Sequence, residues 1–359
     1  MIQVTKTHLP NIDKYQGYVR EIFQSNQLTN NGVLVRELEN RLCSYLNVPY
    51  VVLVSNGTLA LQLAYKLLDL KGEVLTTPFS FVATTSSLVW EGLKPAFVDI
   101  DPETFNLDYS RIAKKITNQT SCILPVHVFG NPCEVEEINK IAEENGLKVI
   151  YDAAHAFGTT YKDNSILNYG DVSILSFHST KIFHTIEGGA LIVQDEELYQ
   201  RAKRLINFGF GMHGIPEELG INAKMNEFQA AMGLCLLDDI DEIIKQRANI
   251  HDCYMERLSG VPGISFVYFN EFGTRNYSYF PILLDSENTV LSVKSAMESQ
   301  NIYPRRYFYP SLDKLPYIDS SEMKNSGDIA KRILCLPMYG ELKEAEIDLI
   351  CNILINQLN

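Results

Sequence analysis

The sequence predicts an α/β fold, with a large domain built on a mainly parallel sheet of seven strands and a smaller α+β domain. Short apolar runs rich in β-branched residues alternate with helical patterns in the first half of the chain, as in βαβ units. A long helical repeat begins at residue 226, and mixed strand and helix patterns follow it. The chain has 359 residues, 46% of them hydrophobic, which is enough to form both cores.

Seven apolar runs are the candidate strands of the large sheet. The first five are separated by segments long enough for crossover helices, such as residues 58–70 and 134–145, and are expected to lie parallel. The last two flank a loop that has no room for a long helix, so we expect an antiparallel connection there. The runs cover residues 50–54, 73–77, 95–100, 121–128, 148–151, 172–177 and 190–193.

One long helix is predicted from residue 226 to residue 258, because apolar residues recur there at helical spacing. We expect it to connect a large domain of residues 1–235, which holds the predicted sheet, with a small domain of residues 236–359. The small domain is expected to contain two strands and a helix, at residues 264–268, 279–284 and 290–300.

The composition argues against several classes of function. The formal net charge is −13, so the chain has no basic surplus to neutralise the phosphates of a nucleic acid. No apolar run reaches the length of a membrane span, and the first ten residues lack the pattern of a signal peptide. The seven cysteines are scattered without a CxxC pair, so we expect reduced thiols, a cytoplasmic location and no metal site.

Two charged residues near the ends of predicted strands indicate the chemistry. Lys181 follows the run that ends at Phe177, and Asp152 ends the run that begins at Lys148. A lysine amine can condense with an aldehyde, and a carboxylate can pair with a pyridinium nitrogen, as pyridoxal 5'-phosphate (PLP) requires. Taken singly, Asp152 could equally cap a helix and Lys181 could be an exposed loop residue.

A candidate phosphate site accompanies this pair. Residues 55–58 open a predicted helix, whose N-terminus presents unpaired amides suited to a phosphate. Gly57 permits close approach of the backbone and Thr58 adds a hydroxyl, although an ordinary helix cap would have the same sequence. Phe81 is a candidate to stack on the cofactor ring and His155 to lie beside it, while either could be a core residue. The three features together predict a PLP site.

These residues lie in motifs that resemble the DegT/DnrJ/EryC1/StrS family of sugar aminotransferases, which are fold-type I PLP enzymes. The resemblance runs nearly end to end, and so many motifs in the same order make a chance match implausible. The matching motifs are Asn31-Gly32, Val54-Ser-Asn-Gly-Thr58, Thr77-Pro-Phe-Ser-Phe-Val-Ala-Thr84, Phe97-Val-Asp-Ile-Asp101, Pro125-Val-His-Val-Phe-Gly130, Asp152-Ala-Ala-His-Ala156, Ser176-Phe-His-Ser-Thr-Lys181, Glu187-Gly-Gly189 and Gly220-Ile-Asn222.

The resemblance implies that Lys181 bonds to the cofactor aldehyde and that Asp152 pairs with its ring nitrogen. Asn222 would reach the cofactor phosphate of a neighbouring subunit, so a homodimer with shared active sites is implied. The family commonly has an arginine where this chain has Lys224, and a bidentate arginine contact does not survive as lysine. The remaining implied cofactor contacts are Gly57, Thr58, Phe81, His155 and Ser176.

The resemblance also implies a reaction in two halves. L-Glutamate gives its amino group to PLP, which leaves pyridoxamine 5'-phosphate, and a nucleotide-linked keto sugar then takes the amino group. Lys181 argues against the related sugar 3-dehydratases, which have histidine at that position. A non-catalytic PLP-binding regulator would be expected to lack the lysine or to carry a DNA-binding segment, and neither feature is present.

The segment around Lys181 resembles the members that aminate C-4, which favours dTDP-4-keto-6-deoxyglucose as the acceptor. GDP-4-keto-6-deoxymannose and C-3 keto sugars are the alternatives, and the implied pathway is O-antigen or lipopolysaccharide sugar synthesis. Arg305 and Tyr307 lie among cations and aromatics that suit a nucleotide diphosphate, although this segment could also be a structural turn. The candidate substrate contacts are Thr29, Asn30, Asn31, His184, Glu187, Arg305 and Tyr307.

The glycine-rich segment 207–220 has no periodic pattern. Two interpretations are open, a flexible surface loop and a loop that lines a site or crosses to a partner subunit.

Overall fold

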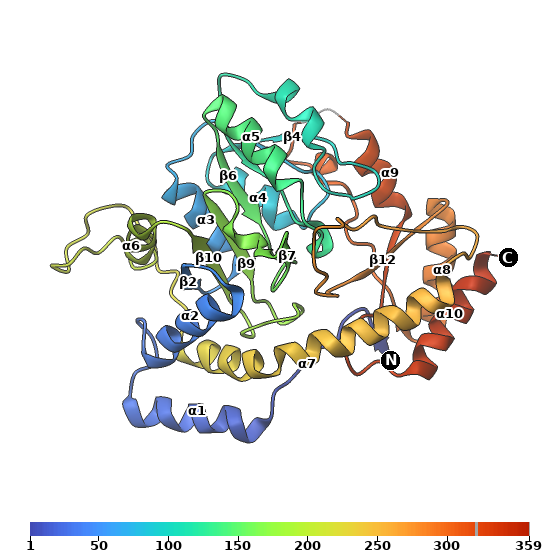
Figure 1. Ribbon diagram of the computed structural model, residues 1–359, viewed down its shortest axis with the longest axis horizontal. Helices are drawn as coiled ribbons and strands as arrows, with labels where there is room; N and C mark the ends of the chain where they lie inside the picture. The colour runs from blue at the N-terminus through green and yellow to red at the C-terminus, as the bar shows by residue number, and fades with distance from the viewer. Residues whose placement is uncertain (320–321, 359) are drawn as a thin grey trace.

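The computed structural model describes residues 1–319 and 322–358, and the predicted seven-stranded sheet lies at its centre (Figure 1). The order across this sheet is β2-β10-β9-β6-β5-β3-β4. All neighbours pair in parallel except β10, which is antiparallel to both β2 and β9, as the short connection predicted. The strands are β2 (Tyr50–Val54), β3 (Glu73–Thr76), β4 (Lys94–Phe97), β5 (Thr120–Leu124), β6 (Lys148–Asp152), β9 (Val172–Ser176) and β10 (Gly189–Val193).

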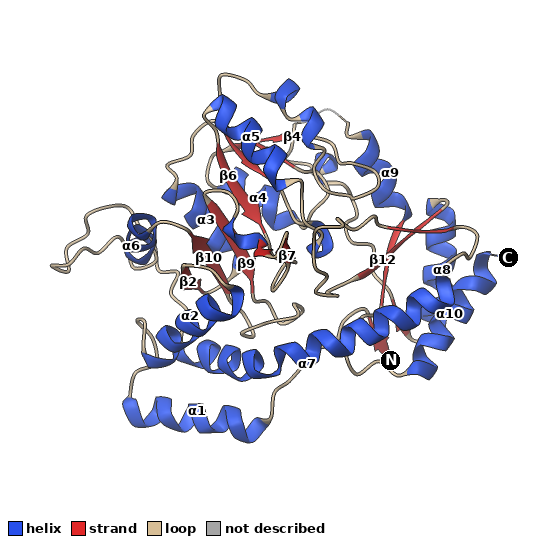
Figure 2. Cartoon of the chain, in the orientation of Figure 1, coloured by secondary structure: helices blue, strands red, loops and turns tan. Residues whose placement is uncertain are grey.

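Successive side chains of a strand point to opposite sides of the sheet. Because the strands consist of consecutive apolar residues, both faces of the sheet are apolar. In β2, Val51 and Leu53 belong to one core, whereas Val52 and Val54 belong to the other. The first core packs on α1, α2, α5 and the first half of α7, and the second packs on α3, α4 and α6 (Figure 2). These helices are α1 (Ile12–Ser25), α2 (Val33–Leu46), α3 (Gly57–Leu67), α4 (Val82–Trp90), α5 (Val135–Asn145), α6 (Glu196–Leu205) and α7 (Glu227–Leu258).

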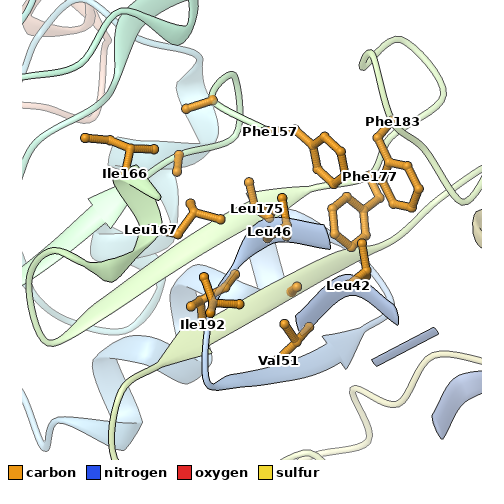
Figure 3. Close-up of a cluster of buried hydrophobic side chains, with 14 of the residues drawn as sticks. Leu42, Leu46, Val51, Phe157, Ile166, Leu167, Leu175, Phe177, Phe183 and Ile192 are labelled. Carbon is orange, nitrogen blue, oxygen red and sulfur yellow. The ribbon is translucent and has the colours of Figure 1, made fainter. Parts of the chain in front are cut away.

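Aromatic packing in the first core fixes the loop that follows β9. The rings of Phe157 and Phe183 stack with centroids 4.5 Å apart, and Phe177 meets Phe183 edge to face at 4.9 Å. Figure 3 shows these rings near Leu42, on the same side of the sheet as Leu175. Because Phe177 and Phe183 are fully buried on either side of residue 181, the loop between them has little freedom to move.

The C-terminal unit, residues 259–319 and 322–358, has its own apolar core. Buried residues of α7 up to Ile243 belong to the core beneath the large sheet, whereas those from Ile250 onward belong to the C-terminal core. A three-stranded antiparallel sheet of order β11-β12-β14 lies in this unit. Its elements are β11 (Ile264–Phe266), β12 (Phe280–Leu284), α8 (Glu287–Ser299), β13 (Ile302–Tyr303), α9 (Lys324–Arg332), β14 (Ile333–Leu336) and α10 (Glu344–Leu358).

The N-terminus lies beside this unit, as Figure 1 shows, because β1 (Ile2–Gln3) pairs in parallel with β13. No pattern in the first residues indicated this pairing. A small hairpin of β7 (Thr160–Tyr161) and β8 (Asn164–Ser165) lies after β6. The division into residues 1–235 and 236–359 stays a prediction, since α7 runs unbroken through that boundary. Within the described ranges, no helix has the length and apolar character needed to cross a membrane.

Glu227, the first residue of α7, is buried and caps a second helix. Its carboxylate oxygens accept hydrogen bonds from the backbone amides of Leu34 (2.9 Å) and Val35 (3.1 Å), in the first turn of α2. A Cβ at Gly32 would lie 2.4 Å from the Glu227 carboxylate carbon, so a larger residue at the start of α2 would displace this carboxylate. Glu227 therefore joins the starts of two core helices and fixes the turn that precedes α2.

We expect Glu227→Ala to lower the stability of the protein by about 1 to 3 kcal/mol, because two amides lose their acceptor. The thermal midpoint should fall by a few degrees, about 2 to 6 °C, in a melting experiment. Glu256→Ala is the matched control, since that side chain is 82% exposed on the same helix. Equal midpoints for the two variants would contradict the capping role of Glu227.

Candidate active site

A cavity of about 410 Å³ lies at the edge of the sheet where the parallel strands end. Strands β2, β6 and β9 finish at this edge, and β10 begins there because it runs the other way. Open α/β sheets bind ligands in the crevice outside the carboxyl ends of their strands. The predicted site residues that line the cavity are Gly57, Thr58, Phe81, Asp152, His155, Ser176, Lys181, Glu187, Arg305 and Tyr307.

The start of α3 forms one end of the cavity. Asn56 is the N-cap, and its side-chain oxygen accepts from the Leu59 amide at 2.9 Å. The N–H groups of Gly57 and Thr58 come before the first intrahelical hydrogen bond and are therefore unpaired within the helix. They lie at the positive end of the helix dipole. A Cβ at Gly57 would lie 2.9 Å from Cβ of Ser176, so glycine lets the helix start meet the end of β9. The two amides and the Ser176 hydroxyl together suit a phosphate.

Asp152 ends β6 with its side chain buried at 5% exposure. One carboxylate oxygen accepts from the Thr84 hydroxyl at 2.8 Å, and the other accepts from the Ala154 amide at 3.1 Å. Burial raises the pKa of Asp152, while these hydrogen bonds and the charge of Lys181 lower it. A carboxylate has about four lone-pair sites, so Asp152 can still accept from a protonated ring nitrogen.

His155 lies beside Asp152 in a neutral form. Burial lowers its pKa well below the usual value, and the charge of Lys181 acts in the same direction. Its Nδ1 accepts from the Phe129 amide at 3.3 Å, so the ring proton is on Nε2. The ring is parallel to that of Phe308 at 5.6 Å, which fixes its plane inside the cavity.

Lys181 extends into the cavity from the loop fixed by Phe177 and Phe183. Burial lowers the pKa of its amine to about 8, although the charge of Asp152 opposes this shift. Such an amine loses its proton easily near neutral pH, as a nucleophile or a proton carrier must. Its Nζ donates to the hydroxyl of Tyr279 at 3.4 Å.

The C-terminal unit forms the opposite wall. Tyr279 precedes β12, and residues 305–308 follow β13. The guanidinium of Arg305 donates to the Tyr307 hydroxyl at 3.3 Å and lies 5.6 Å from the centre of that ring. The cavity is therefore completed only when both units are folded against each other.

His184, a candidate substrate contact, does not line the cavity of its own chain. Its ring is buried with Nε2 hydrogen-bonded to the backbone oxygen of His8 at 2.8 Å, while Nδ1 accepts from the Ile186 amide at 3.2 Å. These bonds hold Ile186 at a positive φ of 69°, a strained conformation for a β-branched residue. His184 therefore supports the turn before Glu187.

Thr29, Asn30, Asn31 and Asn222 also do not line the cavity of their own chain. Thr29 and Asn30 are exposed before α2, and the side chain of Asn31 accepts from Lys203 at 2.8 Å. Asn222 is exposed and pairs through its backbone with Asn207, where the glycine-rich loop 207–220 begins. This loop extends outward beyond α6 in Figure 1. The role of these residues in a neighbouring subunit stays a prediction.

Several lining residues were missed by the sequence reasoning. Thr84, which binds Asp152, lies within a quoted motif and also bonds to Ser80 at 2.8 Å, four residues earlier. That spacing at the start of a helix was a usable signal. Tyr279 had none, because only the packing of the C-terminal unit brings it to the cavity, whereas Phe308 directly follows Tyr307 among the aromatics already considered as nucleotide contacts.

The residues present fit PLP. A glycine-lined phosphate site, a buried acid and an amine of lowered pKa share one cavity, and the 58% exposed ring of Phe81 offers a stacking face. In the described residues, no group of three or more histidine, cysteine or acidic side chains is arranged to hold a metal ion.

We expect Gly57→Ala to weaken PLP binding by about 10-fold or more, because the added methyl would push Ser176 away from the amides that hold the phosphate. The dissociation constant can be measured by titrating PLP-free protein and following the absorbance of the bound cofactor. Gly17→Ala is the matched control, since a Cβ there meets nothing within 4 Å. Unchanged affinity in Gly57→Ala would argue against a phosphate at this helix start.

Comparison with known proteins identifies the family of this chain. Residues 11–355 match the model of the DegT/DnrJ/EryC1/StrS aminotransferase family. The dTDP-4-amino-4,6-dideoxy-D-glucose transaminases of Shigella dysenteriae and Escherichia coli are 44% and 41% identical to this chain. The alignments cover 97% of both chains for the first and 99% of both for the second.

More distant relatives share the fold. GDP-perosamine synthase of Escherichia coli O157:H7 is 30% identical over 94% of both chains. A crystal structure of DesI, determined in the presence of its TDP-sugar product, superposes with a TM-score of 0.94 at 33% identity. That match covers 99% of this chain and 92% of the DesI chain. The chain therefore belongs to the DegT/DnrJ/EryC1/StrS aminotransferase family, as its motifs predicted.

Proposed function

We propose that this aminotransferase moves the amino group of L-glutamate to C-4 of dTDP-4-keto-6-deoxy-D-glucose, giving dTDP-4-amino-4,6-dideoxyglucose. The observation that carries the proposal is the Lys181 amine and the Asp152 carboxylate in one cavity beside the start of α3. The names of the Shigella dysenteriae and Escherichia coli relatives, at 44% and 41% identity, support the choice of sugar.

The family uses PLP, and five residues of this chain would hold it. The amides of Gly57 and Thr58 and the hydroxyl of Ser176 would bind the phosphate, Asp152 would bind the ring nitrogen, and Lys181 would bond to the aldehyde carbon. Bound in this way, PLP supplies an electron sink that makes the α-proton of an amino acid removable.

Asp152 and Lys181 divide the work of this site. Asp152 would pair with the ring nitrogen of PLP and keep it protonated, and this pairing would keep the buried carboxylate ionised against the effect of burial. With a pKa of about 8, the free amine of Lys181 can take the α-proton of glutamate. It would then return this proton to the carbon of the cofactor's aldehyde group. In the second half-reaction the keto sugar takes the place of glutamate, and Asp152 and Lys181 act in the same steps run backwards.

Substrate contacts are proposed at the mouth of the cavity. Arg305 carries a guanidinium suited to the diphosphate of a nucleotide sugar, and Tyr307 lies under it. Glu187 lines the same opening, 3.6 Å from the ring of His178.

We also propose a homodimer in which Asn222 and residues 29–31 enter the cavity of the neighbouring subunit. Support comes from the loop 207–220, whose apolar side chains are exposed in a single chain. These side chains are Phe208, Phe210, Met212, Ile215 and Leu219.

A cytoplasmic location and a role in O-antigen or lipopolysaccharide synthesis complete the proposal. All seven cysteines are free, which suits a reducing compartment. A 28% identical relative from Bacillus subtilis is named a spore coat polysaccharide biosynthesis protein, which supports a polysaccharide pathway.

Two alternatives concern the acceptor. A GDP-linked 4-keto sugar is favoured by the 30% identity to GDP-perosamine synthase. A C-3 keto sugar is favoured by the 31% identity to UDP-2-acetamido-2-deoxy-3-oxo-D-glucuronate aminotransferase of Pseudomonas aeruginosa. A purely regulatory PLP-binding protein would not need a buried lysine of lowered pKa, so this function has less support.

An absorbance titration tests the proposed reaction. We expect the band of bound PLP to bleach with L-glutamate and to return when dTDP-4-keto-6-deoxyglucose is added. The band should be absent in Lys181→Ala, which lacks the amine that bonds to the aldehyde. Bleaching without return would overturn the sugar assignment and favour the GDP-linked or C-3 acceptors. No bleaching with any amino donor would overturn transamination.

Mixed dimers test the shared site. We expect Lys181→Ala and Asn222→Ala to be nearly inactive alone, since each dimer then has two defective sites. Mixing them through a step of mild dissociation should restore activity to about a quarter of wild type, because half of the dimers gain one intact site. No recovery, with dimers confirmed by light scattering, would mean that Asn222 does not act in the neighbouring subunit.

A further inference from the structure

Tyr279 contacts the active-site lysine from the other side of the cavity. Its hydroxyl lies 3.4 Å from Nζ of Lys181, although the two residues are 98 positions apart. Among the residues that the structure describes, this is the one side-chain hydrogen bond of the Lys181 amine. Lys181 follows a strand of the large sheet, whereas Tyr279 belongs to the C-terminal unit.

Three rings hold the Tyr279 side chain in place. Its ring meets His155 at 4.8 Å, Phe129 at 5.3 Å and the edge of Tyr307 at 5.7 Å between centroids. Aromatic pairs at these separations prefer defined angles, so the phenol has few ways to turn. The hydroxyl is therefore directed at the amine by packing, before any substrate is present.

The backbone before Tyr279 is also bound on both sides. Arg247 of α7 donates to the carbonyl of Ser278 at 3.2 Å. The side-chain amide of Asn276 donates to the carbonyls of His155 (2.8 Å) and Phe157 (3.0 Å), in the loop after Asp152. The hydroxyl of Tyr279 thus has a fixed place relative to the loop that follows Asp152.

A phenol suits both forms of the amine. Its oxygen can accept from the ammonium, and its proton can be donated to the neutral amine, whereas phenylalanine can do neither. Burial raises the pKa of Tyr279, so the phenol keeps its proton across the working pH range. The other titratable groups that face the amine are Asp152, His155 and Tyr307.

We propose that Tyr279 is a positioning residue for Lys181, whose hydroxyl holds the amine at the place from which it moves the substrate proton. It acts whenever the amine is not bonded to the cofactor. The inference rests on the proposed function, since a lysine that never carries a proton would need no such partner. It also makes the docking of the C-terminal unit a condition for a correctly placed lysine.

Tyr279→Phe tests this, with Tyr277→Phe as the matched control because the Tyr277 ring packs on His251 at 5.2 Å and does not line the cavity. The first readout uses PLP-free protein and a small amine-reactive reagent, with labelling of the Lys181 peptide followed by mass spectrometry across pH. We expect Tyr279→Phe to lower the pKa of Lys181 by about 0.5 to 1 unit, because the ammonium loses an acceptor. Tyr277→Phe should match wild type.

The second readout uses the PLP-loaded protein and the glutamate half-reaction alone. We expect Tyr279→Phe to slow this step by about 10- to 100-fold with glutamate affinity within about 2-fold, and α-deuterated glutamate to give a larger isotope effect. An unchanged labelling profile, or a shifted profile with a half-reaction within about 2-fold of wild type, would overturn the proposal. If the wild-type protein itself gave no half-reaction, the proposed function would fail instead. The wild-type measurement therefore tests the function, and the comparison with Tyr279→Phe tests the role of Tyr279.

Discussion

The active-site edge depends on close contact between the first turn of α3 and the ends of β9 and β10. A Cβ at Gly57 would lie 2.9 Å from Cβ of Ser176, and one at Gly189 would lie 2.7 Å from the carbonyl carbon of Asn56. Because β10 lies between β2 and β9, a helix start and a strand end that are far apart in sequence meet here. Lys181 then follows Ser176 within five residues and enters the same cavity. A larger residue at either glycine would push the start of α3 away from these strands, and so away from the lysine.

The second constraint is the cost of burying charged groups in one cavity. Burial lowers the pKa of Lys181 and raises that of Asp152, while the charge of each partly offsets the effect on the other. A ligand with a cationic ring nitrogen and an aldehyde would relieve both groups, because it would give the acid a counter-charge and would take up the deprotonated amine in a covalent bond. The binding free energy of such a ligand also stabilises the folded chain, since the unfolded chain has no such site.

The part of this arrangement that could be predicted is the part recorded in local sequence. Strands buried on both faces read as continuous apolar runs, and their carboxyl ends carry Asp152 and, five residues beyond Ser176, Lys181. The place of Tyr279 could not be predicted, because it depends on how the C-terminal unit docks. The environment of His184 could not be predicted either. The local sequence does not show whether this side chain faces a cavity or, as in the structure, the carbonyl of His8.

Lys224, which stands where the family commonly has an arginine, contacts the start of the glycine-rich loop 207–220. Its ammonium donates to the side-chain oxygen of Asn207 at 2.7 Å and lies 5.2 Å from the centre of the Phe208 ring. Asn207 pairs with Asn222 through the backbone, so the lysine closes the base of the glycine-rich loop. The lysine therefore holds the loop base next to Asn222, the residue proposed to enter a neighbouring cavity.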